Sequence, residues 1–390
     1  MIVALALLAT LQQPAQGSLP NDAYLFFVAS EWRDQVALVR FGKNGVRVEH
    51  RTPIRLPSVD AINPRELRVA PDGRSYFVVT SHGFPSGELI KFRISDDIPG
   101  VFQRPDTVVA REPLGAFPAA LDVTPDGEYA WVTNAAAAGT SQPSWISVVY
   151  LRQMIELERI PTCPAPRGGR FSADGSRFYA TCSGSDELVE FDARAMKEAR
   201  RLTLHAAGSA DCGSSAAVPG ADGTRLLVAC ARTGELLEVD VGAWSVTRRI
   251  RVGPSPSTIA VSRDGATAVV GNGGNQTVSL VDLAAGRELT QLPTIYAFSV
   301  NFSLTAGDPF LPFHVAVEFA WTRAMRRVPT GIVITPDGRY ALVSVGGVGA
   351  ELGGVDVIEI ATGKIVAIAD VGAGAHGIDF WKIDRATRPN

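Results

Sequence analysis

The chain has 390 residues, of which 46% are hydrophobic and 20% charged, and it contains 38 glycines and 25 prolines. Its formal net charge of −3, with both signs interspersed, gives no electrostatic reason to expect nucleic acid or an anionic membrane as a partner. So many turn-forming residues predict short elements rather than long helices. A chain of this length often holds two or three domains, but repeat proteins are an exception to that expectation.

The N-terminus has the pattern of an export signal. Residues 2–11 form a short apolar run, and Ala15-Gln16-Gly17 provides a small-x-small cleavage site. The run is too short to span a bilayer, no Lys or Arg precedes it, and no Cys follows it that could carry a lipid. We predict that residues 1–17 are a signal peptide cleaved after Gly17, which implies a periplasmic or secreted protein. The alternative is that the run forms a buried strand.

Three predicted strands follow this leader. Residues 27–30, 35–41 and 46–51 are rich in the residue types that favour strands. They correspond to the second, third and fourth strands of the repeat that fills the rest of the chain. No corresponding first strand precedes them.

Six Asp-Gly pairs recur from here to the C-terminus, most of them between two runs of strand-forming residues. Asp-Gly in this setting is a strong signal for a β-hairpin, because glycine accepts positive φ and aspartate caps the turn. The first five pairs are 42 to 54 residues apart, the period of a β-propeller with four strands in each blade. The pairs are Asp72-Gly73, Asp126-Gly127, Asp174-Gly175, Asp222-Gly223, Asp264-Gly265 and Asp337-Gly338.

The strand that follows each hairpin ends in a tetrapeptide such as Trp131-Val132-Thr133-Asn134. Pro329-Thr330-Gly331-Ile332 and Pro336-Asp337-Gly338 form a Pro-x-Gly-Ile-x-x-x-Pro-Asp-Gly motif. Over nearly the whole mature chain, the sequence resembles the YVTN-repeat family of β-propellers. The resemblance implies an all-β, seven-bladed propeller of four-stranded antiparallel blades, similar to lactonase-like and surface-layer-type propellers.

Four cysteines occupy matched positions in two successive blades. Cys163 and Cys212 precede the first strand of their blades, and Cys182 and Cys230 end the second strand. An even number of cysteines in an exported chain favours disulfides, and these spacings are not those of a zinc site. We predict the disulfides Cys163–Cys182 and Cys212–Cys230, and we expect no metal site and no cofactor.

An insertion of about residues 291–328 separates the last two hairpins, which are 73 residues apart. It is rich in aromatic residues, and the alternation of Phe298, Val300 and Phe302 favours strand. It also carries His314 and ends in several arginines. Two interpretations stay open: a lid or docking element, or an extended blade whose aromatic residues pack on the disc.

The missing first strand is found at the C-terminus. Residues 376–381 match the first strand of the repeat, but no hairpin follows them. We predict that this strand completes the N-terminal blade, so that residues 18–390 form one closed ring without exposed sheet edges. We expect this ring to be a monomer.

The length of the connections distinguishes the two faces of the predicted disc. The Asp-Gly hairpins and the third-to-fourth turns lie on one face and are generally short. The loops 82–87, 135–144 and 346–354, together with the insertion, lie on the other face. Because binding residues gather in loops on a rigid scaffold, we expect this second face to be the working surface.

The residue seven positions before each hairpin aspartate opens the innermost strand at that face. Two cations, three hydroxyls and one imidazole at the axial mouth would suit a polar or anionic ligand, and the imidazole could make the site sensitive to pH. The alternative is a water-filled channel without a specific ligand. The residues are Arg65, Ala119, Arg167, Ser215, Ser257 and Thr330, with His376 in the seventh place.

The sequence contains no nucleophile elbow, phosphate loop, dinucleotide fingerprint or c-type haem motif. This favours a non-catalytic exported propeller that binds a polar or anionic small molecule, or a partner protein. The family resemblance implies the alternative, an enzyme or enzyme subunit: a lactonase-like hydrolase or a component of a periplasmic oxidoreductase.

Overall fold

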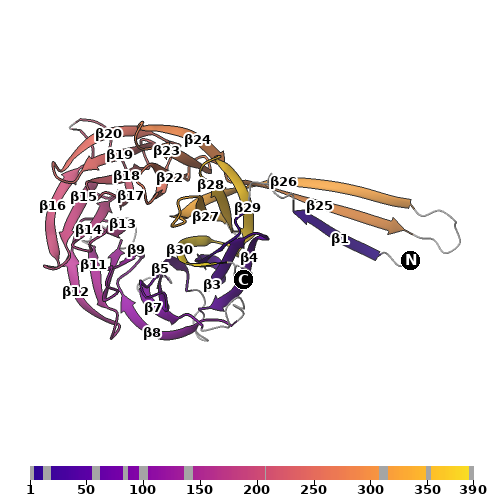
Figure 1. The fold of residues 1–390 in the computed structure, drawn as a ribbon, viewed down its shortest axis with the longest axis horizontal. Helices are drawn as coiled ribbons and strands as arrows, with labels where there is room; N and C mark the ends of the chain where they lie inside the picture. Colours follow the sequence, from indigo (N-terminus) through magenta and orange to yellow (C-terminus); the bar gives the residue numbers. More distant parts are fainter. Residues whose placement is uncertain are drawn as a thin grey trace, which may run out of the picture.

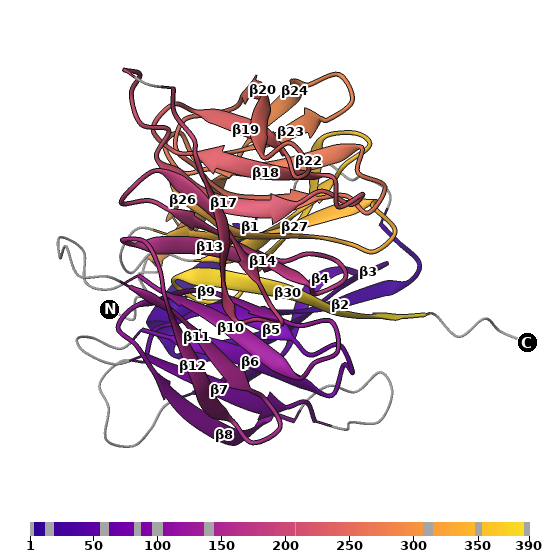
Figure 2. The same cartoon turned by 90° about the vertical axis from the view of Figure 1, so that its left-hand side faces the viewer.

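Seven antiparallel sheets stand around one axis and form a seven-bladed β-propeller (Figures 1 and 2). The computed structural model describes residues 4–11, 19–54, 62–81, 87–95, 104–135, 144–206, 208–306, 315–347 and 353–385. Within this part of the chain, the only helix is the short 3-10 helix η1 (Glu31–Arg33). The predicted fold class is therefore confirmed.

Each blade has four strands, named in order from the axis outward. Blade 1 contains β30 (Ala375–Asp384), β2 (Ala23–Ser30), β3 (Gln35–Gly42) and β4 (Gly45–Pro53). Blade 2 contains β5 (Pro64–Val69), β6 (Ser75–Thr80), β7 (Gly87–Arg93) and β8 (Thr107–Leu114). Blade 3 contains β9 (Pro118–Val123), β10 (Tyr129–Asn134), β11 (Trp145–Tyr150) and β12 (Ile155–Pro161).

The remaining four blades follow in chain order. Blade 4 contains β13 (Pro166–Phe171), β14 (Arg177–Cys182), β15 (Glu187–Asp192) and β16 (Lys197–Thr203). Blade 5 contains β17 (Ser214–Pro219), β18 (Arg225–Cys230), β19 (Glu235–Asp240) and β20 (Ser245–Arg251). Blade 6 contains β21 (Pro256–Val261), β22 (Thr267–Asn272), β23 (Thr277–Asp282) and β24 (Arg287–Pro293), and blade 7 contains β26 (Val315–Ile334), β27 (Tyr340–Gly347), β28 (Gly354–Glu359) and β29 (Lys364–Asp370).

The six Asp-Gly pairs form the predicted hairpins between the first and second strands. All six glycines have φ between 66° and 74°, a region that other residues adopt only with strain. In each turn the aspartate side chain accepts a hydrogen bond from the backbone N–H two residues later, as Asp126 does from Glu128 at 2.9 Å. The turn chemistry that the sequence predicts is therefore present in every repeat.

The hydrophobic core is divided into seven clusters, and each cluster joins two neighbouring blades. The cluster between blades 7 and 1 includes Tyr340, Phe41 and Ile378, and the next one joins Phe27 to Tyr76. Since most of the apolar burial lies between blades, each blade depends on both of its neighbours for stability.

Ring closure occurs as predicted, because β30 pairs with β2 along the inner side of blade 1. Side chains of β30 also bind the next blade: Trp381 donates from Nε1 to the carbonyl of Gly73 at 2.8 Å. Asp379 accepts a hydrogen bond from the backbone N–H of Val69, also at 2.8 Å. The C-terminal strand thus connects blade 1 to blade 2.

The two cysteine pairs are disulfide-bonded, with Cα–Cα distances of 5.8 Å for Cys163–Cys182 and 4.8 Å for Cys212–Cys230. Each closes a loop within one blade. Loop closure in the unfolded chain predicts a stabilisation of about 3 kcal/mol for a loop of this length. We expect the variant Cys163→Ala, Cys182→Ala to lose about that much unfolding free energy in urea titrations. An unchanged free energy under oxidising conditions would contradict this role.

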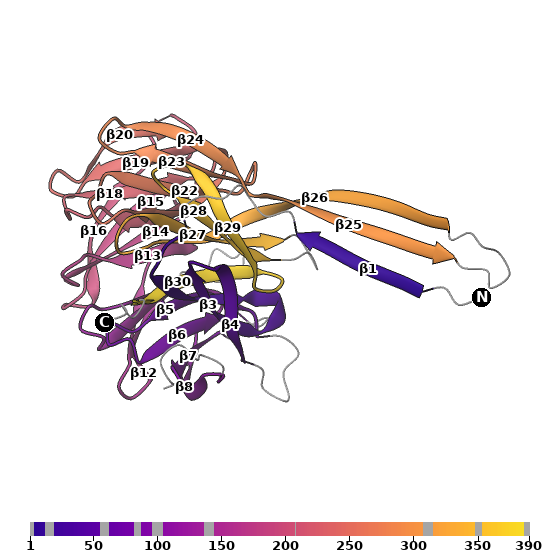
Figure 3. The ribbon, with the colours of Figure 1, turned by 45° about the vertical axis from the view of Figure 1, so that its right-hand side comes forward.

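The insertion forms a long hairpin. Strand β25 (Ile295–Ala306) pairs with the first part of β26, which continues without interruption into blade 7. Figures 1 and 3 show this hairpin projecting away from the ring, so it does not cover the axial channel. The strand pattern predicted there is confirmed, and the lid interpretation finds no support. His314 and residues 307–313 lie outside the described residues.

Residues 4–11, within the predicted signal peptide, form strand β1 (Ala4–Leu11), which pairs with β25 from Ala4–Thr305 to Leu11–Phe298. The run therefore forms a strand in the uncleaved chain, as the alternative interpretation predicts, and the burial of that strand stays a prediction. Cleavage after Gly17 stays a prediction, because residues 12–18 lie outside the described part.

One expectation about loop length is wrong. The connection between β7 and β8, from Arg93 to Thr107, is among the longest in the chain and lies on the hairpin face. Repeat spacing alone does not reveal it, because the extra residues fall between two strands of one blade. Most residues of loops 82–87, 135–144 and 346–354 lie outside the described part. Loop length therefore does not identify the working face.

Candidate functional site

The channel mouth is a cavity of about 670 Å³ on the propeller axis. This volume lies in the usual range for small-molecule sites. All seven residues predicted at the mouth line it, together with Glu66 and Arg170 from deeper in the channel. The predicted mouth residues are Arg65, Ala119, Arg167, Ser215, Ser257, Thr330 and His376.

A β-bulge brings most of these residues to the mouth. In five blades the register between the first and second strands skips the mouth residue: Arg65, Ala119, Ser215, Ser257 and Thr330. A bulge changes the direction of a side chain and often occurs next to a binding site. The repeat predicts these positions correctly, but strand alternation does not predict the bulge that directs them into the channel.

Blade 4 differs, because its skipped residue is Gly168, directly after Arg167. Gly168 has φ of 43°, and a Cβ atom there would lie 2.7 Å from Cα of Ala216 in blade 5. Only glycine fits this close approach between two blades. Arg167 therefore reaches the mouth from a position that is paired with the second strand, whereas the mouth residues of the other five blades named above lie in the bulge itself.

Two of the predicted hydroxyls serve the fold. Ser215 donates to the carbonyl of Pro256 in the next blade at 2.8 Å, and Thr330 donates to the carbonyl of Ala375 at 2.7 Å. Their protons are therefore engaged between blades. Ser257 is exposed, and its hydroxyl has no hydrogen-bond partner among the described residues.

The two arginines at the mouth are poorly neutralised. The nearest carboxylate oxygen to Arg65 belongs to Glu31, at 3.9 Å from Nε. Arg167 is exposed, and no described residue forms an ion pair or hydrogen bond with its guanidinium. Desolvation in the channel and the positive charge of Arg65 lower the pKa of Arg167. Two like charges that line one cavity favour an anionic ligand.

His376 provides the imidazole of the mouth. Burial and the charge of Arg65 lower the pKa of its imidazole, although Glu31 and Glu66 act in the opposite direction. Its Nδ1 atom is buried and has no hydrogen-bond partner among the described residues. The lowered pKa favours the neutral imidazole over a third positive charge at the mouth.

Deeper in the channel the charges neutralise each other. Arg68 binds Glu66 at 2.8 Å and Asp122 at 3.2 Å, and Asp122 also accepts the backbone N–H of Phe171 at 2.8 Å. Asp379 accepts the N–H of Val69 in the same way. This layer joins neighbouring blades. Arg170 of the same layer lies 4.0 Å from Glu66 and donates to the carbonyl of Gly169 at 2.7 Å.

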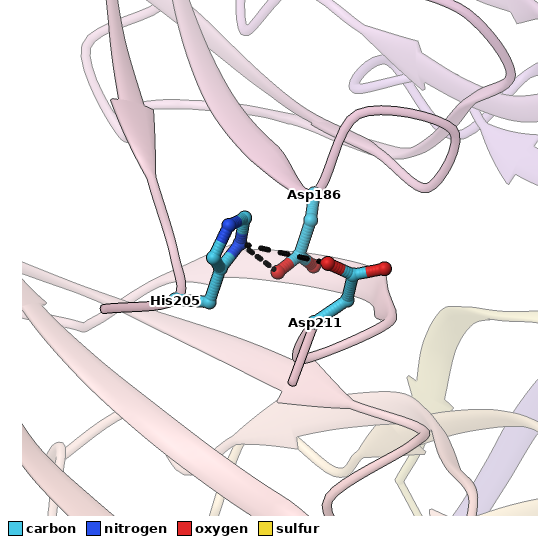
Figure 4. A group of neighbouring side chains, drawn as sticks. All are labelled: Asp186, His205 and Asp211. Carbon is cyan, nitrogen blue, oxygen red and sulfur yellow. Dashed lines mark hydrogen bonds and ion pairs between the residues drawn. The ribbon is translucent and has the colours of Figure 1, made fainter. Parts of the chain in front are cut away.

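Asp186, His205 and Asp211 form a second polar cluster, shown in Figure 4. The buried carboxylate of Asp186 accepts Nδ1–H of His205 at 2.9 Å, and Asp211 forms an ion pair with Arg232 at 2.7 Å. Asp186 also accepts three backbone N–H groups at 2.8 to 3.1 Å, from Cys212, Gly213 and Ser214. Four donors occupy the lone pairs of this carboxylate, so the cluster fixes the connection between blades 4 and 5.

Asp34 confirms this structural interpretation. It precedes the third strand of blade 1, as Asp186 precedes the third strand of blade 4, and both have positive φ. Asp34 accepts the backbone N–H groups of Ile62 and Asn63 at 2.9 and 3.0 Å. Neither aspartate was predicted from the sequence, because an aspartate at a turn carries no distinctive pattern.

Comparisons with known proteins agree with the fold. No protein-family model and no curated protein matches the sequence, so membership of the YVTN-repeat family stays a prediction. Similar solved structures include a protein of unknown function from Desulfotomaculum acetoxidans, with 14% identity, a TM-score of 0.62 and coverage of 92% of this chain and 98% of that one.

Two further structures have named activities. A candidate 6-phosphogluconolactonase from Bacteroides uniformis has 13% identity and a TM-score of 0.63, and the match covers 92% of this chain and 99% of that one. A dihydro-heme d1 dehydrogenase has 16% identity and a TM-score of 0.54, with 95% and 79% covered. At these identities the likeness shows the seven-bladed fold alone. Among the described residues, no helix is long and apolar enough to cross a membrane.

Proposed function

We propose that this protein is an exported binding propeller whose axial mouth holds an anionic small molecule or an acidic segment of a partner protein. The observation that carries the proposal is the pair Arg65 and Arg167, which line one cavity and have no carboxylate oxygen of a described residue closer than 3.9 Å to either guanidinium. Guanidinium groups bind carboxylates and phosphates through paired, charge-assisted hydrogen bonds. The two disulfides are compatible with the predicted periplasmic or extracellular location.

The variant Arg65→Ala, Arg167→Ala tests this proposal. A hydrogen bond to a charged group contributes about 1.5–3 kcal/mol, so loss of both arginines should weaken binding of an anion on the order of 100-fold or more. The melting temperature should not fall, because neither guanidinium has a close ion-pair partner among the described residues. Calorimetric titration with a panel of organic acids and phosphate esters provides the affinities.

Arg74→Ala, Arg263→Ala is the matched control. Both residues are exposed and lie at hairpins on the opposite face, so the control has the same change in net charge. It should retain the affinity of the wild type. Equal weakening in the two variants would show that binding depends on overall charge rather than on the mouth.

A lactone hydrolase is the second candidate function. The candidate lactonase among the similar structures favours it, and opening of a lactone yields a carboxylate that the two arginines would hold. His376, with its unpartnered Nδ1, would be the first residue to test as a base. Hydrolysis of a lactone panel, combined with metal and cofactor analysis of the purified protein, distinguishes this enzyme from the binding propeller.

A further inference from the structure

The wall between the two mouth arginines is unusually small and uncharged. Arg65 belongs to blade 2 and Arg167 to blade 4, and the mouth residue of blade 3 between them is Ala119. Ala119 is half-buried and lies at the bulge, the same position that carries the arginine in blade 2. The other residues of this wall are also uncharged: Phe117, Pro118, Ala120 and Ala135.

The carboxylates deeper in the channel have partners in their own layer. Glu66 and Asp122 bind Arg68, and Asp122 also accepts the backbone N–H of Phe171 in blade 4. Asp379 accepts the backbone N–H of Val69. Arg65 and Arg167 line the same cavity as Ala119, and the small side chain of this alanine leaves space in the wall between them. The small side chain of this alanine leaves space for a negatively charged group, and the two neighbouring cations provide a positive electrostatic potential there.

We propose that an oxyanion, either a carboxylate or a phosphate, sits over Ala119 and bridges Arg65 and Arg167 across blade 3. On this assignment Ala119 determines specificity, because any longer side chain there would occupy the seat of the anion. The inference rests on the proposed function and adds the place of the charged group and the blade that leaves room for it.

A carboxylate attached at position 119 should act as a built-in ligand. We would introduce Ala119→Cys and alkylate the new thiol with iodoacetate or with iodoacetamide, which gives side chains of nearly equal size that differ in charge. The four native cysteines are disulfide-bonded, so they do not react with these alkylating reagents. Both adducts are attached to folded protein, so the comparison does not depend on the folding of a charged variant.

The acidic adduct should raise the melting temperature above that of the neutral adduct, because it relieves the repulsion between the two arginines. When the same two adducts are prepared in the variant Arg65→Ala, Arg167→Ala, their melting temperatures should be equal. Both adducts should reduce binding of inorganic phosphate and of succinate at least 10-fold relative to the wild type. Preference for one of these two probes in the wild type identifies phosphate or carboxylate as the bound group.

The outcomes separate the two claims. The proposal that the anion lies over Ala119 would be overturned by equal melting temperatures of the two adducts. A difference between the adducts that persists in Arg65→Ala, Arg167→Ala would overturn it as well. Both conclusions hold even where the wild type binds anions at the mouth. Unchanged phosphate and succinate binding after alkylation would also overturn it. Failure of the proposed function gives a different result: the variant Arg65→Ala, Arg167→Ala then binds every anion with the same affinity as the wild type.

Discussion

A chain that ends at Gly374 is expected to aggregate and to lose cooperative unfolding. It lacks β30, the innermost strand of blade 1, and therefore exposes the edge of β2. Two core clusters lose members, including Ile378, Phe380 and Trp381. Burial of a large apolar side chain contributes about 1.5–3 kcal/mol, so the loss approaches the whole stability of a typical protein, about 5–15 kcal/mol.

Size-exclusion chromatography and thermal melts provide the measurement. A chain that ends at Arg385 keeps all of β30 and serves as the control. A synthetic peptide of residues 372–385, added during refolding, should restore part of the soluble ring, whereas a scrambled peptide should not. A chain ending at Gly374 that stays monomeric and melts with the control would show that ring closure is dispensable.

Asp186→Ala is expected to destabilise the protein by about 3–9 kcal/mol. It removes the acceptor for three backbone N–H groups, and each buried donor left unsatisfied costs about 1–3 kcal/mol. Asp211→Ala removes a carboxylate of the same cluster that is exposed and pairs with Arg232 in water. That pair contributes less than about 1 kcal/mol, so Asp211→Ala is the matched control.

The contribution of Asp186 should depend on pH. Burial alone would raise the pKa of this carboxyl, but the N–H groups of Cys212, Gly213 and Ser214 and the ring of His205 lower it overall. A lowered pKa in the folded state stabilises the protein above the unfolded-state pKa of about 3.9, and this contribution disappears as the pH falls through the folded-state value. The difference in unfolding free energy between wild type and Asp186→Ala should therefore shrink in acid.

Urea titrations at several pH values test both statements. Similar losses in Asp186→Ala and Asp211→Ala would contradict the structural role of Asp186. A rise in the melting temperature of the wild type with Zn²⁺ or Ca²⁺, absent in Asp211→Ala, would show instead that the cluster holds a cation.

The sequence predicts the architecture because its signals are local and repeated. Asp-Gly hairpins, the Cys182 and Cys230 positions and the orphan strand of residues 376–381 each recur or complete a pattern, so seven blades and ring closure follow from spacing. The ring of residues at the mouth follows from the same repeat. Repetition also explains why the prediction of the disulfides is confirmed.

Features that depend on contacts between blades could not be predicted. The hydroxyls of Ser215 and Thr330 bind carbonyls of the neighbouring blade, and nothing in their own strands indicates this. The lowered pKa of His376 depends on burial and on Arg65, which is more than 300 positions away in the chain. The bulges that direct mouth residues into the channel depend on the register between strands, which residue types at single positions do not determine.

The most direct test of the anion site is anomalous diffraction from crystals grown with selenate, an oxyanion whose position the selenium signal reveals. We predict a peak at the axial mouth over Ala119, within hydrogen-bonding distance of the guanidinium groups of both Arg65 and Arg167, and no such peak in Arg65→Ala, Arg167→Ala. An empty mouth in which both arginines pair with carboxylates between blades would contradict the site.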